Sequence, residues 1–175
     1  MKLIERFKTA GQILVGMKSS PMLDETVKVH RAMGRVKHIR NGVVLSDEVI
    51  FNVKTTVGID FTFAQTYGTS AQANGLNYIA LSNDTLTETT ASTTLSTEIA
   101  ANGLARAIGA YAHTGGASTA TISKTFTCAT GAQSAQKAAL FSASSAGTMH
   151  HALAFTQRAL QVGDQLAVTF TITLT

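Results

Sequence analysis

The segment QLAVTFTITL, residues 165–174, alternates strictly between apolar side chains and mostly hydroxyl-bearing ones. Successive side chains of a β-strand point to opposite faces, so this segment has one apolar face and one face rich in threonine. The pattern therefore predicts a strand that buries one face in a core and turns the other outward. The apolar face carries Leu166, Val168, Phe170, Ile172 and Leu174, and the opposite face carries Thr169, Thr171 and Thr173.

Shorter segments of the same kind precede it. Turn signals lie between them, at Gly115-Gly116, Thr130-Gly131, residues 144–147 and Gly163-Asp164. Short strands with a turn about every 8–12 residues are typical of a sandwich or barrel rather than of an α/β fold. We therefore expect a mainly β protein built as an antiparallel β-sandwich. The candidate strands are NYIALS (77–82), GLARAIGAYAH (103–113), TATISKTFTC (119–128), QKAALFSA (136–143) and TMHHALAFT (148–156).

A β-hairpin is predicted over residues 34–56. Its turn is Asn41-Gly42, because both central positions of a tight hairpin turn need a positive φ that Asn and Gly adopt at low cost. We expect residues 1–33 to form an N-terminal arm and residues 34–175 to form one sandwich domain, with the main sandwich over 77–175. Ser19-Ser20-Pro21 interrupts any helix in the arm, since the residue before a proline avoids the helical region.

Residues 55–68 predict one short helix. Thr55 or Thr56 would cap it, and Gly68 would end it. Its apolar face would carry Val57, Phe61 and Ala64. Alternation of Ile59, Phe61 and Phe63 is also compatible with a strand, and we favour the helix.

The segment from Leu81 to Ala101 is rich in Thr and Ser and joins two predicted strands. It is not proline-rich, as a mucin-like stalk would be. Leu86, Leu95 and Ile99 recur along it and would dock it on the sandwich. We predict an ordered loop that crosses one end of the sandwich, and long loops of this kind usually serve a function or form a contact surface.

The composition points to a packed protein with a weakly charged surface. Of the 175 residues, 45% are hydrophobic and 14% are charged, against about 25% charged in an average globular protein. The chain therefore has enough apolar surface to offset its conformational entropy. Hydroxyl-rich surfaces suit proteins that pack against neighbours, and they also suit secreted β-proteins.

The net charge of +4 is confined to residues 1–60, which hold ten of the fourteen basic residues and six of the ten acids. This asymmetry is compatible with an acidic protein partner, with nucleic acid, or with a merely solvated basic surface. Against nucleic acid, the basic residues are scattered and have no aromatic residues between them. The N-terminal segment has no continuous apolar region, and no stretch is long enough to span a membrane, so neither a secretory signal nor a membrane segment is expected.

Candidate catalytic and metal-binding residues are few. His150 and His151 are adjacent in a predicted strand and would point to opposite faces, so they do not readily share a metal; one would pack inward or at an interface and the other would be solvated. His113 lies elsewhere, and His30 and His38 read as solvated. No GxSxG elbow and no phosphate-binding glycine loop is present.

The remaining chemical groups also have simple structural explanations. Asp164 follows Gly163 at a turn, where its side chain can bond back to the backbone. The single cysteine, Cys128, allows no intrachain disulfide and reads as a small buried apolar residue. We therefore expect no enzyme, no cofactor and no metal.

The order of elements from residue 52 onward resembles a family of virion structural proteins of tailed bacteriophages. The resemblance covers about two-thirds of the chain and implies a jelly-roll-like sandwich that serves as a head decoration (cement) protein or as a tail or neck component. FTFAQTYG (61–68) departs from the leucine-rich helix of that family. The matching segments are NVKTTVGIDF, NYIALSNDT, TLSTEIAANGLARAIGAYAH, KTFTCATGAQSAQKAALFSASSAGTMHHALAF and LQVGDQLAVTFTITL.

Taken together, these patterns indicate a non-enzymatic protein of the virion, made in the host cytoplasm and present in several copies. The expected partners are the major capsid protein or another virion protein, bound through the arm and the loops, and further copies of the chain itself in a homo-oligomer, with a decoration role ahead of a tail or neck role. A carbohydrate-binding module for host attachment is the alternative from another class; exposed tyrosines in a cleft would favour it, although the chain has no Trp and only Tyr67, Tyr78 and Tyr111. The arm residues expected to bind the partner are Ile4, Arg6, Phe7, Lys8, Ile13, Leu14 and Lys18.

Overall fold

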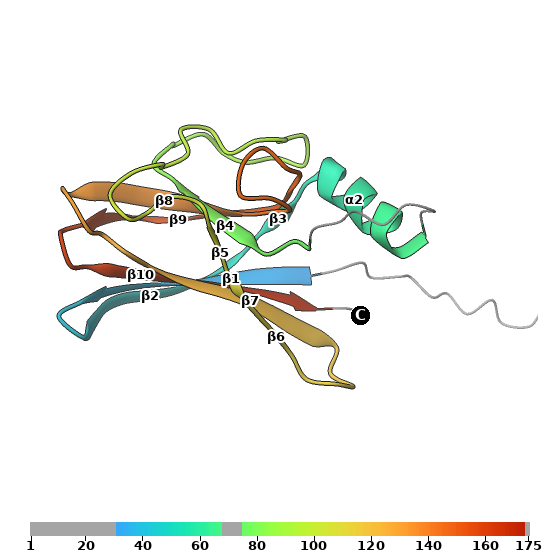
Figure 1. Cartoon of the computed structure of the whole chain (residues 1–175), viewed down its shortest axis with the longest axis horizontal. Helices are drawn as coiled ribbons and strands as arrows, with labels where there is room; N and C mark the ends of the chain where they lie inside the picture. Colours follow the sequence, from blue (N-terminus) through green and yellow to red (C-terminus); the bar gives the residue numbers. More distant parts are fainter. Residues whose placement is uncertain (1–30, 68–74, 174–175) are drawn as a thin grey trace, which may run out of the picture.

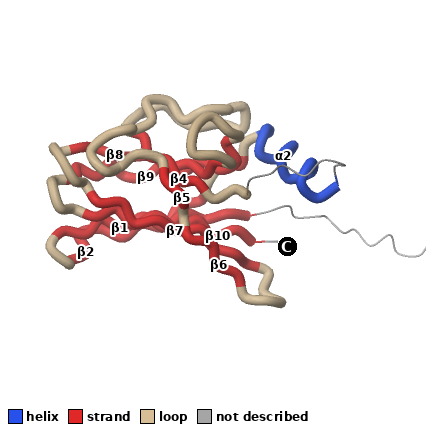
Figure 2. Tube along the Cα trace, viewed as in Figure 1, coloured by secondary structure: helices blue, strands red, loops and turns tan. Residues whose placement is uncertain are grey.

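The computed structural model describes residues 31–67 and 75–173. Within these residues two five-stranded antiparallel sheets pack on each other, so the predicted β-sandwich is confirmed (Figures 1 and 2). Sheet A has the order β2-β1-β10-β7-β6 and sheet B has the order β3-β9-β8-β4-β5. The strands are β1 (Arg31–Arg40), β2 (Val43–Phe51), β3 (Val53–Lys54), β4 (Tyr78–Ser82), β5 (Ala107–Ile108), β6 (Ala110–His113), β7 (Thr119–Thr127), β8 (Gln133–Phe141), β9 (Met149–Leu160) and β10 (Gln165–Thr173), and the helix is α2 (Thr56–Tyr67).

The main core lies between the two sheets. Leu166, Val168 and Phe170 of β10 are fully buried there, whereas Thr169 and Thr171 are half-buried on the other face. The alternation read from residues 165–174 is thus confirmed over the described part of that segment. Facing residues of sheet B, such as Leu140 and Leu153, complete the contact between the sheets.

The hairpin and the helix form where the sequence predicts them. Asn41 and Gly42 join β1 to β2 with φ values of 49° and 77°. Thr55 caps α2, because its hydroxyl oxygen accepts a hydrogen bond of 3.1 Å from the backbone N–H of Gly58. Phe61 is buried under the helix as expected, whereas Gly68 lies outside the described residues.

The outer face of sheet B is covered by α2 and by the long loop between β4 and β5 (Figure 1). The helix lies so close to β9 that a Cβ at Gly58 would sit 2.7 Å from the Cα of His150. Under the loop, Leu95 packs with Ala80, Phe141 and Met149 in a second apolar cluster. Sheet B is therefore buried on both faces over β4, the second half of β8 and the first half of β9, whereas Ala154 and Thr156 further along β9 are exposed.

The loop is ordered as predicted, but its position differs from the prediction. It covers the outer face of sheet B, where Leu95 is buried, rather than crossing an end of the sandwich. Ile99 is buried in the main core, with its N–H donating to the carbonyl of Leu81, whereas Leu86 is 65% exposed and does not dock. The loop thus completes the protein's own second layer.

Two predicted boundaries are corrected by the structure. The strand predicted over 103–113 is divided at Gly109, because Ala107–Ile108 pairs with β4 in sheet B and Ala110–His113 pairs with β7 in sheet A. The sandwich also begins at Arg31, since β1 pairs with β10 from that residue onward, three residues before the predicted domain boundary. Among the described residues, no helix is long and apolar enough to cross a membrane.

Candidate functional site: an uncovered sheet face and an end cleft

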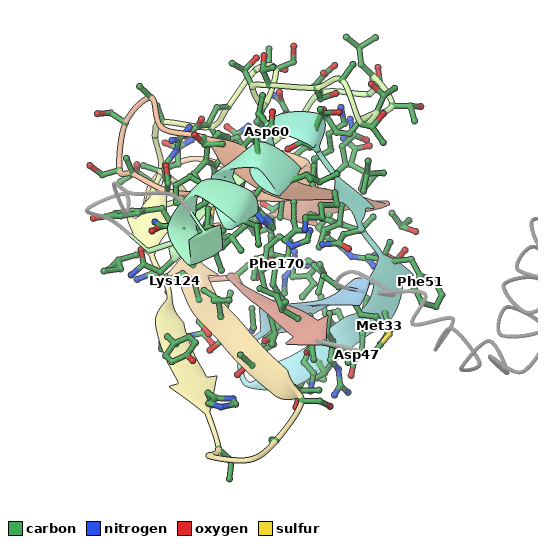
Figure 3. All side chains as sticks on the ribbon, turned by 90° about the vertical axis from the view of Figure 1, so that its right-hand side faces the viewer. Met33, Asp47, Phe51, Asp60, Lys124 and Phe170 are labelled. Carbon is green, nitrogen blue, oxygen red and sulfur yellow. The ribbon has the colours of Figure 1, made fainter. Side chains whose placement is uncertain are left out.

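The outer face of sheet A is covered by no helix or loop within residues 31–67 and 75–173 (Figures 1 and 3). We call it the open face. Its central strands, β10 and β7, present mainly Thr, Ser and Ala, and its flank on β1 and β2 presents larger side chains. The open face consists of Met33, Arg35 and Lys37 on β1, Asp47, Val49 and Phe51 on β2, Ala110 and Ala112 on β6, Thr121, Ser123 and Thr125 on β7, and Ala167, Thr169 and Thr171 on β10.

One corner of the open face is apolar. Phe51 is 77% exposed, Val49 is 63% exposed and Met33 is 39% exposed. Met33 and Phe51 lie opposite each other in the β1–β2 register, and Figure 3 shows both side chains at the same edge of the molecule. Exposed apolar groups gathered in this way mark a contact surface more often than isolated ones do.

The few charges of the open face gather around one carboxylate, that of Asp47. Arg35 donates two hydrogen bonds to Asp47, of 2.7 and 2.5 Å, and Lys37 lies 3.5 Å from the same carboxylate. The hydrogen bond from Arg35 lowers the pKa of Asp47. The cations are thus held within the face, and the strands β10, β7 and β6 beside them present uncharged side chains to the outside.

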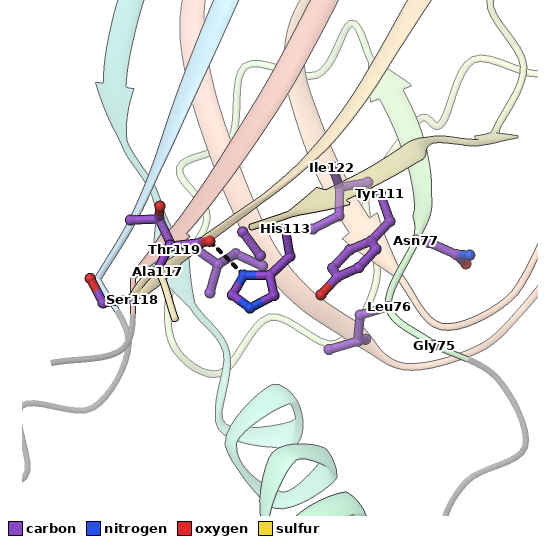
Figure 4. Close-up of a pocket in the computed structure, with 11 residues that line it drawn as sticks. Gly75, Leu76, Asn77, Tyr111, His113, Ala117, Ser118, Thr119 and Ile122 are labelled. Carbon is purple, nitrogen blue, oxygen red and sulfur yellow. Dashed lines mark hydrogen bonds between the residues drawn. The ribbon is translucent and has the colours of Figure 1, made fainter. Parts of the chain in front are cut away.

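A cleft of about 530 Å³ opens at the end of the sandwich, where the hairpin of β6 and β7 extends beyond sheet B (Figure 4). Leu76, Ile122 and Ile172 supply apolar lining, and the ring of Tyr111, which is 64% exposed, stands at the opening. His113 lies beside it with Nδ1 2.9 Å from the carbonyl oxygen of Thr119. Because a carbonyl only accepts, Nδ1 carries the proton, and Nε2 of the neutral ring is left as an acceptor.

Asp164 is a carboxylate with several hydrogen-bond partners, buried at the turn between β9 and β10. Arg40 donates two hydrogen bonds of 2.8 Å to it, His38 Nε2 lies 2.7 Å away, and the N–H of Gln161 donates at 2.9 Å. The hydrogen bonds from Arg40 are the main cause that lowers its pKa far below the ordinary range. The turn bond predicted for Asp164 is present, but its partners on β1 were not predicted.

A second buried ionic group fixes the long loop on sheet B. Lys137 of β8 is only 2% exposed, and its ammonium group lies 3.2 Å from Asp84 and 3.0 Å from Glu88 of the loop. Nearer the end of the loop, Arg106 donates to Glu98 at 2.8 Å and stacks 3.6 Å above the ring of Phe141. These contacts make the loop a rigid layer of the sandwich.

The histidine predictions were partly wrong. His150 and His151 are both buried, so neither is solvated. Thr62 of α2 donates its hydroxyl to Gly58 and lies 2.7 Å from His150 Nε2, which places His150 at the helix–sheet contact. His38 is buried against Asp164 rather than solvated, because β1 and the β9–β10 turn meet there.

Cys128 keeps the role expected of it, and several other candidates lie outside the described residues. Cys128 is buried, and its thiol donates to the carbonyl of Gly131. In the part of the chain that the structure describes, no three His, Cys, Asp or Glu side chains are grouped to hold a metal ion. The predicted partner-binding residues Ile4, Arg6, Phe7, Lys8, Ile13, Leu14 and Lys18, together with His30, lie outside the described residues.

Comparison with known proteins adds no relative: no family model, no curated protein and no solved structure matches the chain. A functional assignment therefore has to be argued from the surfaces of this chain.

Proposed function

We propose that this protein is a non-enzymatic structural protein of a bacteriophage virion, and that it acts as a capsid decoration protein. The observation that carries the proposal is the contrast between the two sheets. Sheet B is closed by α2 and the loop, whereas sheet A presents a five-stranded face with an apolar corner and few charges. Such a face is suited to broad contact with another protein surface, because its core is depleted in charge.

The place where residues 1–30 join the sandwich supports the same role. β1 begins at Arg31, two residues before Met33 in the apolar corner. The preceding thirty residues contain Arg6, Lys8 and Lys18 among apolar residues such as Phe7. A basic segment joined at an exposed apolar corner favours an acidic protein lattice as the partner, since opposite charge speeds encounter and fixes orientation.

Binding of the full-length protein to capsids tests this proposal. Empty capsids assembled from the major capsid protein of the same genome are sedimented either with the parent protein or with the double variant that carries Lys8→Glu and Lys18→Glu. We expect saturable binding of the parent protein and weaker binding of the double variant, with the difference shrinking at high salt. Absence of binding to capsids, together with binding to isolated tails or necks, would replace the decoration role by the tail or neck role.

A second function, binding of a host carbohydrate, is favoured by one observation. Tyr111 stands exposed at the opening of the end cleft, beside His113 and above apolar side chains. An aromatic ring with polar neighbours is the arrangement that sugar rings stack upon. Screening the protein against a set of immobilised glycans tests it, and a signal that persists in Tyr111→Ala would exclude the cleft as its source.

A further inference from the structure

The strand registers fix how side chains of the open face lie in rows across sheet A. In one row, Phe51 pairs with Met33, Met33 with Thr171, Thr171 with Thr121, and Thr121 with Ala112. The next row runs through Val49, Arg35, Thr169, Ser123 and Ala110. Each row thus begins with a large apolar residue on β2, has threonine on the central strand β10, and ends with alanine on β6.

We propose that a second copy of this chain packs on the open face, related by a two-fold axis parallel to β10. This rests on the proposed assembly role and makes a second copy the occupant of the open face; the dimer would then bind the capsid through other surfaces, such as the predicted arm. Such an axis places β1 of one copy over β7 of the other, β2 over β6, and β10 over β10. Two sheets that pack face to face keep their strands within about 30° of parallel and lie about 10 Å apart.

Complementary size supports this arrangement. Phe51 then faces Ala112 of the other copy, and Val49 faces Ala110. The bulky flank of each copy therefore lies against the flat flank of its partner, and Thr169 and Thr171 meet their own equivalents on the axis. Close packing at an interface needs this alternation of large and small side chains, as it does in a protein core.

Charge selects this axis over the other possible one. A two-fold axis across the strands would place β1 over β1 and bring Arg35 and Lys37 near the same cations of the second copy. Like charges brought together at an interface are costly. With the axis along β10, Arg35 faces Ser123 and Lys37 faces Thr125, both uncharged.

The extent of the open face matches what a stable dimer needs. Three strand spacings of about 4.8 Å spanned by nine residues of about 3.3 Å, and a fourth spanned by the four residues of β6, give a planar area of roughly 500 Å². A standard interface buries about 800 Å² of accessible surface per partner, which exceeds the planar area because side chains add relief. The whole open face, rather than the apolar corner alone, would therefore be covered.

A cysteine crosslinking experiment on the full-length protein tests the geometry. Val49→Cys and Ala110→Cys are made separately, mixed, re-equilibrated and treated with a short bismaleimide. We expect severalfold more crosslinked dimer in the mixture than in either variant alone, and we expect Thr169→Cys to crosslink with itself. The parent protein is the blank, because Cys128 is buried. Crosslinking of Val49→Cys with itself at the level of the mixture would overturn the proposed axis.

A charge substitution tests the interface independently. Phe51→Lys should weaken dimerisation about tenfold or more, measured by sedimentation velocity over a concentration series. Leu86→Lys is the matched control, because Leu86 is also an exposed apolar residue, at 65%, but lies on the loop over sheet B. A parent protein that is monomeric throughout, or equal effects of the two variants, would overturn the proposal. Dimers that fail to bind capsids would instead refute the decoration role alone.

Discussion

The Asp164 cluster offers the sharpest test of how β1 is held to the turn between β9 and β10. Asp164 is 1% exposed and accepts hydrogen bonds from the guanidinium group of Arg40 and from the N–H of Gln161. Its carboxylate also lies 2.7 Å from Nε2 of His38. In Asp164→Asn the side-chain amide has a single oxygen. We expect that oxygen to take the place of Oδ2, where His38, one nitrogen of Arg40 and the N–H of Gln161 meet. The amide nitrogen then faces Arg40 Nε, so one charge-assisted bond of about 1.5–3 kcal/mol is lost.

The remaining bonds also weaken, because the acceptor is no longer charged. The side chain of Arg40 is 39% exposed, so water screens its interaction with the carboxylate and reduces the free energy lost with that interaction. We therefore expect the free energy of unfolding to fall by about 3 kcal/mol, near the lower end of the range for breaking a buried ion pair. For a chain of this length that corresponds to a decrease in Tm of roughly 6–12 °C. Asp47→Asn, which removes an exposed carboxylate paired with Arg35, is the control and should change Tm little.

The lowered pKa of Asp164 also predicts how its contribution to stability changes with pH. The pKa of Asp164 in the folded protein is lowered, chiefly by Arg40, below its unfolded value of about 3.9. Its stabilisation is therefore complete above about pH 5 and is lost as the pH falls, because the unfolded chain takes up the proton first. Urea unfolding at pH 7 and at pH 3 should show a gap between parent and Asp164→Asn that narrows at the lower pH. A gap of equal size at both pH values would refute the reasoning.

Three further substitutions have definite expected outcomes. Lys137→Met leaves two loop carboxylates without their cation, so glutamyl endopeptidase should cleave after Glu88 faster than in Lys124→Met. Gly58→Ala would gain about 1 kcal/mol from helix propensity, but its Cβ would meet the His150 backbone at 2.7 Å, so Tm should fall. Gly42→Ala meets no neighbour but keeps a φ of 77°, so calorimetry should show a loss of about 1–2 kcal/mol. Gly115 has no atom within reach of a new Cβ and no positive φ, so Gly115→Ala is the control for both glycine variants. A loss of stability in Gly115→Ala as large as in those two variants would contradict the explanation.

The sequence predicts most of the fold because the relevant signals are local. Period-two alternation identifies β10, and Asn41-Gly42 identifies the hairpin, since each depends only on neighbouring residues. The division of 103–113 at Gly109 was missed because the segment changes from sheet B to sheet A. That change depends on partners in β4 and β7, which lie far away in the sequence.

The buried polar groups were missed for the same physical reason. His38 and Asp164 are 126 positions apart, and each one alone has an ordinary explanation as a surface or turn residue. Lys137 lies in an apolar strand, and only the folded loop brings two carboxylates to it. Ionic contacts of this kind follow from the register of distant strands, which composition and spacing do not determine.

The open face combines an alternation that is visible in the sequence with an arrangement of side chains that only the strand registers reveal. Alternating threonine on β10 is visible in the sequence, but it does not show whether the threonine side faces water, a helix or a second protein. The registers supply what is missing, because they place Met33 and Phe51 on one side of those threonines and Ala112 on the other. A surface made only for water would need no such ordering of large and small side chains across five strands. Sheet B, with the same number of strands, has its outer face covered by the chain itself, and the corresponding cover for sheet A is the second copy we propose.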